Sequence, residues 1–243
     1  MVVTGGRQAS TGVRKRRNDV HERLLYSRGV RRRSGQRNGL LALARLAVAG
    51  LAVVAITYQY AKLDGAAGFS AGNFFGFFTI QSNLLAVAVL VAAAVVPASE
   101  RSPLFDAVRS GVTLFVAITG VVFAVLLAGL QEELQTTIPW VDTVVHRIVP
   151  LAVVVDWVVD RPLHRLPARV AAAWLAYPAA WFAITLVRGA SVDWYPYPFV
   201  DVGRHGYARV LLNAVVLLAC FTAAALALWW LGNRRAAPAQ VRF

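Results

Sequence analysis

The sequence has little charge and almost no cysteine, and both shortages narrow the class of protein. Only 15% of its 243 residues are charged, against about a quarter in an ordinary soluble domain, which disfavours a soluble enzyme. The single cysteine, Cys220, cannot form an internal disulfide or a multi-cysteine metal site. His146 is the only histidine within an apolar stretch, so a paired-histidine haem site or a multi-histidine metal site lacks its other ligands there.

Motifs of several enzyme and transporter classes are also missing. The sequence has no phosphate-binding glycine loop and no Gly-x-Ser-x-Gly elbow. It shows no inverted repeat of the kind found in broken-helix transporters, although Pro150 and Pro178 are placed to kink two apolar stretches. We therefore expect no metal and no cofactor.

Long apolar stretches dominate what is present. Hydrophobic residues make up 58% of the chain, and the mean hydropathy is +0.57. These residues form blocks of roughly twenty, long enough to cross a bilayer core. The blocks are 39–60, 74–96, 108–130, 139–159, 169–187 and 207–231. The sequence therefore predicts an all-α, polytopic membrane protein, with a six-helix transmembrane domain over residues 39–231.

Most of the positive charge lies in one terminal segment. The net charge is +13, and residues 1–38 hold 11 of the 25 Lys and Arg side chains. This segment has too few apolar residues to fold alone, and we expect a disordered cytoplasmic tail that contacts anionic lipid head groups. It has no interleaved aromatic platform, so we expect no nucleic-acid partner. Residues 232–243 form a second, short basic tail. We expect the first apolar stretch to be retained rather than cleaved as a signal peptide.

The distribution of basic residues predicts the orientation in the membrane. If the N-terminus is cytoplasmic, the cytoplasmic side receives 19 Lys and Arg residues and the outside receives four. Basic residues resist translocation, so we expect both termini inside the cell and a multi-pass protein of the cell membrane.

Two polar side chains within the apolar stretches are predicted at similar depth. Thr79 lies roughly 8 Å into the second stretch and His146 roughly 10 Å into the fourth, both counted from the outer side. A hydroxyl beside an imidazole that can take its proton, with the carboxylate of Asp142 one turn away to orient the imidazole, is the arrangement of an activated nucleophile. Asn83, or Arg147 beside the histidine, is placed to stabilise an oxyanion.

A purely structural interpretation of the same residues stays open. Thr, Ser, Asn and His side chains commonly hold transmembrane helices together by hydrogen bonds. Arg147 has alternative partners in Asp142 and in Glu132 and Glu133 of the outer loop that precedes it. Arg45 has one in Asp156. The loop 193–201, rich in aromatics and proline, is either a structured lid over the outer mouth or an aromatic belt with stiff turns.

Three motifs carry a resemblance to a known family. They are Phe77-Phe78-Thr79-Ile80-Gln81-Ser82-Asn83, His146-x-x-x-Pro150 followed by Asp156-Trp157, and Tyr195-Pro196-Tyr197-Pro198-Phe199. Over residues 40–231 the sequence resembles the bacterial Pr-six-Pr family of six-helix membrane proteins. That family is more distantly similar to the animal androgen-induced and androgen-dependent membrane proteins, which hydrolyse fatty-acid esters of hydroxy fatty acids. Those proteins use a threonine nucleophile and a histidine. The resemblance implies that the corresponding residues here are Thr79 and His146.

Two functional hypotheses follow. In the first, the protein hydrolyses a lipid ester at an intramembrane site open to the outer leaflet, with Thr79 as nucleophile and His146 as general base and acid. In the second, the protein is not an enzyme but a small-molecule carrier or a structural or regulatory partner, and the same polar residues only join helices.

Overall fold

The computed structural model describes residues 38–130 and 138–235, and no strand occurs in these two ranges. The chain divides into two compact units, Met1–Ala44 and Arg45–Phe243. The described part of the first unit is only the beginning of the first helix, and all the other described residues belong to the second unit. The predicted N-terminal tail lies outside the described residues except for its last residue.

Helices account for nearly all of the described chain. The first helix runs from Asn38 to Leu63. It is followed by α2 (Ala71–Gly76), α3 (Phe78–Val95), the 3₁₀ turn η1 (Ala98–Glu100), α4 (Pro103–Val122), the π-helical turn η2 (Phe123–Leu127), α5 (Pro139–Thr143), the π-helical turn η3 (Val144–Ile148), α6 (Val149–Val159), α7 (Ala168–Trp174), α8 (Ala176–Val192), the 3₁₀ turn η4 (Pro198–Val200) and α9 (Val202–Arg235).

Five helical segments of the described chain are long and apolar enough to cross a membrane. They are Asn38–Leu63, Phe78–Val95, Pro103–Leu127, Ala168–Val192 and Val202–Arg234. The stretch 139–159 is also helical throughout, as α5, η3 and α6. It carries three charged side chains, Asp142, Arg147 and Asp156, and for this reason it is not among the five.

The described helices are interrupted at three points, and two of these interruptions, at Pro178 and at Gly206, have a local cause in the sequence. The second predicted helix, 74–96, is interrupted by Phe77, whose extended backbone separates α2 from α3. Pro178 lacks an amide hydrogen, and the chain bends between α7 and α8 just before it. Gly206, at φ 71°, makes a kink near the start of α9, a conformation that glycine adopts at little cost.

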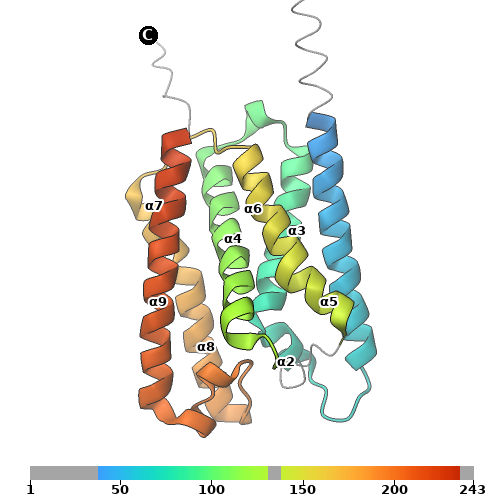
Figure 1. The fold of residues 1–243 in the computed structure, drawn as a ribbon, viewed down its shortest axis with the longest axis vertical. Helices are drawn as coiled ribbons and strands as arrows, with labels where there is room; N and C mark the ends of the chain where they lie inside the picture. Colours follow the sequence, from blue (N-terminus) through green and yellow to red (C-terminus); the bar gives the residue numbers. More distant parts are fainter. Residues whose placement is uncertain (1–37, 131–137, 236–243) are drawn as a thin grey trace, which may run out of the picture. The chain divides into compact units, whose positions relative to one another are not determined.

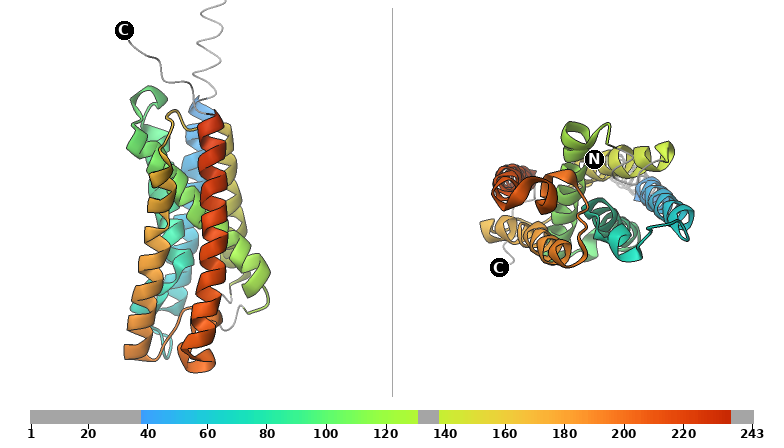
Figure 2. Two further views of the ribbon diagram at one scale, coloured as in Figure 1. Left: turned by 90° about the vertical axis from the view of Figure 1, so that its left-hand side faces the viewer. Right: turned by 90° about the horizontal axis from the view of Figure 1, so that it is seen from below.

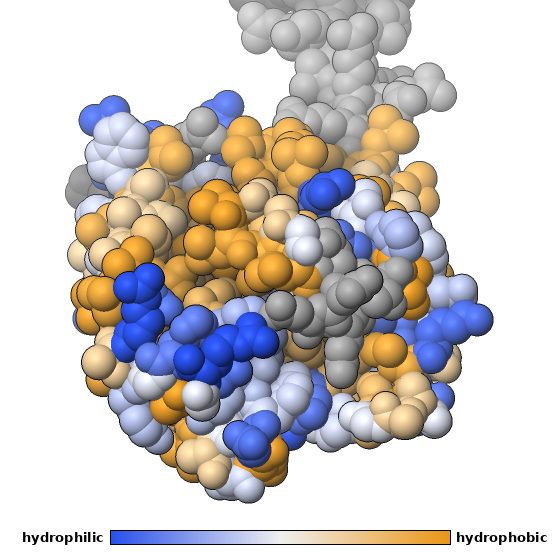
Figure 3. All heavy atoms as spheres, turned by 60° about the horizontal axis from the view of Figure 1, so that its bottom comes forward, coloured by the Kyte–Doolittle hydropathy of each residue, from blue (hydrophilic) through white to orange (hydrophobic). Residues whose placement is uncertain are grey.

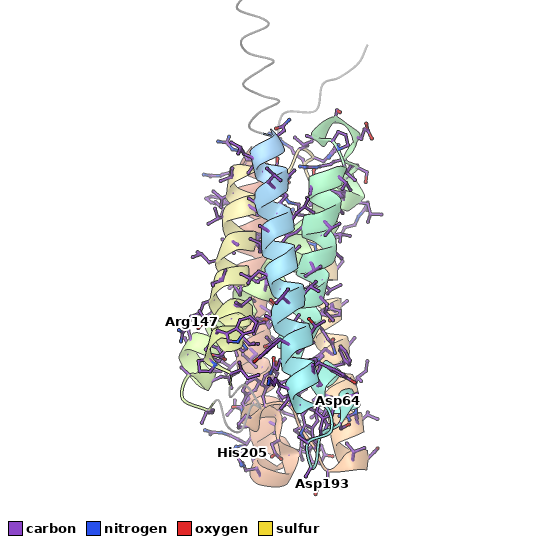
Figure 4. The ribbon with its side chains drawn as sticks, turned by 90° about the vertical axis from the view of Figure 1, so that its right-hand side faces the viewer. Asp64, Arg147, Asp193 and His205 are labelled. Atoms are coloured by element: carbon purple, nitrogen blue, oxygen red, sulfur yellow. The ribbon has the colours of Figure 1, made fainter. Side chains whose placement is uncertain are left out.

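Helix α4 lies in the middle of the unit. Figures 1 and 2 show α8 and α9 on one side of it and α3, α5 and α6 on the other. It packs against α3, α6 and α9, and its Val116 is fully buried. In contrast, α8 and α9 leave many apolar side chains exposed. On the face seen in Figure 3, hydrophobic residues cover much of the side, and hydrophilic residues gather towards the end that carries Asp193 (Figures 3 and 4). Large exposed apolar surface of this kind suits a lipid environment.

A cluster of buried arginines and partly buried aspartates joins three helices at the opposite end, which we call the Arg45 end. Arg45 Nε lies 2.7 Å from Asp156 Oδ1, and Arg45 also pairs with Asp160. From the α4 side, Arg109 Nη2 lies 2.9 Å from Asp156 Oδ2, and Arg101 Nη1 lies 2.6 Å from Asp160 Oδ2. The predicted Arg45–Asp156 pair is therefore confirmed, as part of a larger network that ties the first helix and α4 to the end of α6.

Acid should weaken this network through Asp160, which follows α6 outside the apolar stretches. Burial raises the pKa of its carboxyl, but the hydrogen bond from Arg101 and the charges of Arg109 and Arg45 outweigh burial and hold the pKa below its ordinary value. Its stabilisation is therefore present above the unfolded-state pKa and is lost as pH falls through the folded-state pKa. When the pH is lowered below about 4, we expect the thermal unfolding midpoint of the wild-type protein to decrease. The midpoint of Asp160→Asn is expected to decrease less steeply over the same pH range. Parallel pH profiles for the two proteins would contradict this.

Candidate functional site

Thr79 lies in the first turn of α3, directly after the break at Phe77. Amide hydrogens of a first turn have no acceptor within their own helix, and the Thr79 amide donates instead to the Tyr197 hydroxyl at 3.1 Å. The Thr79 side chain is buried, and its Oγ1 lies 3.3 Å from His146 Nε2. The structure thus brings together the hydroxyl and the imidazole that the sequence placed at similar depth.

The imidazole of His146 is held on two sides. Its Nδ1 lies 3.0 Å from Asp142 Oδ1 and 3.2 Å from the Asp142 carbonyl oxygen. Its ring stacks on Phe123, with centroids 3.9 Å apart and planes 11° from parallel. Oxygens at Nδ1 accept hydrogen bonds, so Nδ1 carries the proton and Nε2 presents a lone pair to the Thr79 hydroxyl. This is the tautomer that a general base requires.

A widened helical turn presents His146 to α3. Pro150 has no amide hydrogen and its ring crowds the carbonyl four residues earlier, which is that of His146. The helix responds by forming η3, in which the Val149 amide bonds to the Val144 carbonyl, five residues back. Gly120 of α4 permits a close approach here, because a Cβ at this position would lie 3.2 Å from the His146 carbonyl oxygen. The His146-x-x-x-Pro150 motif therefore has a local structural cause.

Tyr197 is a site residue that the sequence reasoning did not identify. Its hydroxyl lies 3.2 Å from Thr79 Oγ1, in addition to accepting the Thr79 amide. Burial raises the pKa of the Tyr197 hydroxyl, and the hydrogen bonds with Thr79 only partly offset this, so the group stays protonated and able to donate. The available signal was the Tyr195-Pro196-Tyr197-Pro198-Phe199 motif, which suggested a lid but gave no reason to place this hydroxyl against Thr79.

Asn83 lies one turn beyond Thr79, but its amide hydrogens are already used. Its Nδ2 donates to the Thr79 carbonyl at 2.8 Å and to the Val145 carbonyl at 3.1 Å. Its Oδ1 is buried and has no hydrogen-bond partner among the described residues. Asn83 thus joins α3 to η3 and positions both reacting side chains. The role of an oxyanion donor, predicted for Asn83, does not fit these contacts.

Arg147 does not take part in the site. Its side chain is exposed on the outer flank of η3 (Figure 4), because neighbouring helical residues point about 100° apart and His146 faces inward. Among the described residues, Asp142 pairs with His146 rather than with Arg147. The described residues therefore show no Arg147–Asp142 pair, and the exposed position of Arg147 lends no support to the predicted oxyanion role. Its other predicted partners, Glu132 and Glu133, lie outside the described residues.

An apolar cavity of about 510 Å³ lies beside Thr79, between α3, α4, α8 and α9. Only Thr79, Thr119 and Tyr197 bring hydroxyl groups to its wall. The other lining residues are Phe78, Ile118, Val122, Leu127, Pro178, Ala179, Trp181, Phe182, Phe199, Val200, Leu211, Ala214, Val215, Leu217, Leu218 and Phe221. The loop 193–201 therefore forms part of the cavity wall. The volume and lining suit a lipid chain.

The fold and the site define an all-helical protein of membrane-spanning character, with a buried hydroxyl–imidazole–carboxylate row beside an apolar cavity. Comparison of the chain with models of protein families, with curated proteins and with solved structures gives no match. Within residues 38–130 and 138–235, no three His, Cys, Asp or Glu side chains are grouped so that they could hold a metal ion.

Removal of the Tyr197 hydroxyl should destabilise the fold. In Tyr197→Phe the buried amide of Thr79 loses its acceptor, and an unsatisfied buried donor costs about 1–3 kcal/mol. The matched control is Tyr207→Phe, since Tyr207 is 57% exposed. We expect the unfolding midpoint in detergent to fall for Tyr197→Phe and to stay unchanged for Tyr207→Phe. Equal midpoints in the two variants would show that this hydrogen bond contributes nothing.

Proposed function

We propose that the protein is an integral membrane hydrolase of lipid esters, with Thr79 as nucleophile and His146 as general base and acid. One observation carries the proposal: Thr79 Oγ1, which is at the cavity wall, lies 3.3 Å from an imidazole whose other nitrogen is held by Asp142. A hydroxyl, a base and an orienting group in this order are what nucleophilic catalysis requires. An apolar cavity supplies the binding site for the acyl chain.

The proposed reaction has two steps. Thr79 Oγ1 bonds to the acyl carbon while its proton passes to His146 Nε2, and Asp142 stabilises the imidazolium that forms. Tyr197 donates to the developing oxyanion, helped by the positive end of the α3 dipole. His146 then protonates the leaving alcohol. In the second step water gives a proton to His146 Nε2 and its oxygen bonds to the acyl carbon. The bond between that carbon and Thr79 Oγ1 then breaks, the proton on His146 passes to Oγ1, and a fatty acid is released. The reaction needs no cofactor.

We further propose six membrane spans, with both termini cytoplasmic and the cavity towards the outer leaflet. The five apolar helices and the helical stretch 139–159 supply the spans, and the excess of basic residues at the Arg45 end supplies the orientation. This arrangement, the three motifs and the Thr79–His146 contact agree with membership of the Pr-six-Pr family. In this orientation the basic tail faces anionic head groups of the cytoplasmic leaflet.

A carrier function is less well supported, because apolar side chains separate the two polar regions. Between the site and the Arg45 cluster, α3 buries Ala86 and Leu90, α4 buries Val116, and α6 buries Val149 and Val153. A polar solute crossing this layer would lose its hydration without gaining hydrogen bonds. The structure therefore favours a pocket open on one side over a path through the bundle.

The direct test is ester hydrolysis by the purified protein in detergent. A panel of long-chain esters is incubated with wild type and with His146→Ala, and released fatty acid is measured by mass spectrometry. We expect release by wild type and only the uncatalysed rate with His146→Ala. If wild type with a native helical circular-dichroism spectrum hydrolyses none of the esters, the hydrolase proposal is wrong and the non-enzymatic alternative stands.

Cysteine labelling tests the proposed orientation. The exposed Cys220 is first replaced by serine, and single cysteines are then introduced at the exposed positions Arg165, at the Arg45 end, and Ser191, beside Asp193. A membrane-impermeant maleimide on intact cells is expected to label Ser191→Cys at once and Arg165→Cys only after lysis. The reverse pattern would place the termini outside and contradict the assignment.

A further inference from the structure

The cavity beside Thr79 offers very few partners to water. Its wall has four side chains with polar hydrogens, those of Thr79, Thr119, Tyr197 and Trp181, and each is already bonded within the protein. Thr119 donates to a backbone carbonyl at 2.9 Å, Trp181 does the same at 2.9 Å, and the other two bond to each other. A water molecule in a cavity needs about two to four polar partners. The interior is therefore better suited to apolar chains than to water.

The cavity also opens towards the apolar side of the molecule. Leu211, Val215 and Leu218 of α9 line it and are half exposed or more, at 51%, 64% and 50%. From α8, the exposed Ala179 lines it as well. In a membrane these residues face hydrocarbon. A molecule that enters between α8 and α9 therefore arrives from the lipid phase and carries an apolar chain.

The alcohol released from a lipid ester must leave through the same cavity. It departs from a position next to the acyl carbon and His146 Nε2, which has just protonated it. Because the reverse step uses the same groups in the opposite order, the position that releases a lipid alcohol also accepts one. The acyl-threonine is thus exposed to lipid alcohols more readily than to bulk water.

We propose that the protein is also an acyltransferase, which moves the acyl group from Thr79 to the hydroxyl of a second lipid alcohol. This inference rests on the proposed function, since it needs the same acyl-threonine. The acceptor hydroxyl gives its proton to His146 Nε2, and its oxygen bonds to the acyl carbon. The bond between that carbon and Thr79 Oγ1 then breaks, and the proton on His146 returns to Oγ1. The products are a new lipid ester and free enzyme, with no oxidation or reduction.

The experiment measures how one acyl-enzyme divides between two acceptors. Wild type in lipid nanodiscs receives 4-nitrophenyl palmitate, whose nitrophenolate release reports acylation regardless of the acceptor. 1-Hexadecanol, 1-butanol or glycerol is added, and mass spectrometry compares palmitate with the palmitate ester of each alcohol. Each buried methylene contributes about 0.8 kcal/mol, so we expect the ratio of ester to palmitate to be at least about tenfold higher with hexadecanol than with butanol. Glycerol is expected to give no ester. Thr79→Val supplies the uncatalysed background.

The outcomes separate the two proposals. Nitrophenolate with hexadecyl palmitate as the main product, and ping-pong kinetics in donor and acceptor, would support transfer. Nitrophenolate with palmitate alone, at every hexadecanol concentration, would overturn transfer and leave the hydrolase intact. No nitrophenolate above the Thr79→Val background would overturn the hydrolase proposal and transfer with it.

Discussion

Replacement of Thr79 by valine should lower kcat/KM for lipid esters by about a thousandfold or more, because it removes the hydroxyl proposed as the nucleophile. Valine keeps the β-branched shape of threonine and exchanges only the hydroxyl for a methyl group. The side chain is buried against His146 and Tyr197, so a shape-conserving substitution isolates the chemistry from the packing. Initial rates of fatty-acid release by wild type and variant give the ratio.

Thr79→Ser is the matched control for this loss. Serine keeps a hydroxyl that can reach His146 Nε2 and lacks only the methyl group, so we expect it to retain most of the activity. If Thr79→Val were as active as wild type, Thr79 would not be the nucleophile. If Thr79→Ser were as inactive as Thr79→Val while both kept the wild-type melting temperature, the loss would come from packing and not from the hydroxyl.

Neutralisation of Asp156 should cost about 3–5 kcal/mol in the free energy of unfolding. Asp156 accepts hydrogen bonds from Arg45 and Arg109, whose side chains are 5% and 2% exposed. In Asp156→Asn the shape is nearly unchanged, but both guanidinium groups lose a charged partner where water cannot replace it. Titration with a denaturing detergent, followed by tryptophan fluorescence, measures the change.

Asp64→Asn serves as the control, because Asp64 is exposed in a loop (Figure 4). Surface substitutions of this kind usually change the free energy of unfolding by less than about 0.5 kcal/mol. An equally small change in Asp156→Asn would mean that the Arg45 cluster is an incidental contact and does not hold the helices together.

Much of the helical arrangement could be predicted from the sequence, because the length of each apolar block gives the approximate length of the helix that it forms. The Thr79–His146 contact could also be anticipated, since both polar side chains interrupt apolar stretches at a similar distance from the same side. The break at Phe77 could not, because nothing in an apolar run of this kind signals an extended residue. It matters for the site, since it leaves the Thr79 amide without a helical acceptor.

Tyr197 and the cavity depend on tertiary packing, and sequence patterns do not encode it. Tyr197 is 118 residues from Thr79 along the chain, and no helical period relates a loop to a distant helix. The cavity is lined by side chains of α3, α4, α8 and α9, which lie far apart in the sequence. Arg147 is next to His146 in the sequence, but only one of two adjacent helical residues can face the same partner, and the sequence alone does not tell which of the two faces α3.

Covalent labelling tests the central claim, that Thr79 is a nucleophile, most directly. Purified wild type and Thr79→Val are treated with a lipid-tailed fluorophosphonate, and the modified residue is identified by peptide mass spectrometry. We expect one adduct, on Thr79, that is absent from Thr79→Val and blocked by prior incubation with a long-chain ester. An unlabelled wild-type protein, or an adduct on another residue such as Ser82 that persists in Thr79→Val, would contradict it.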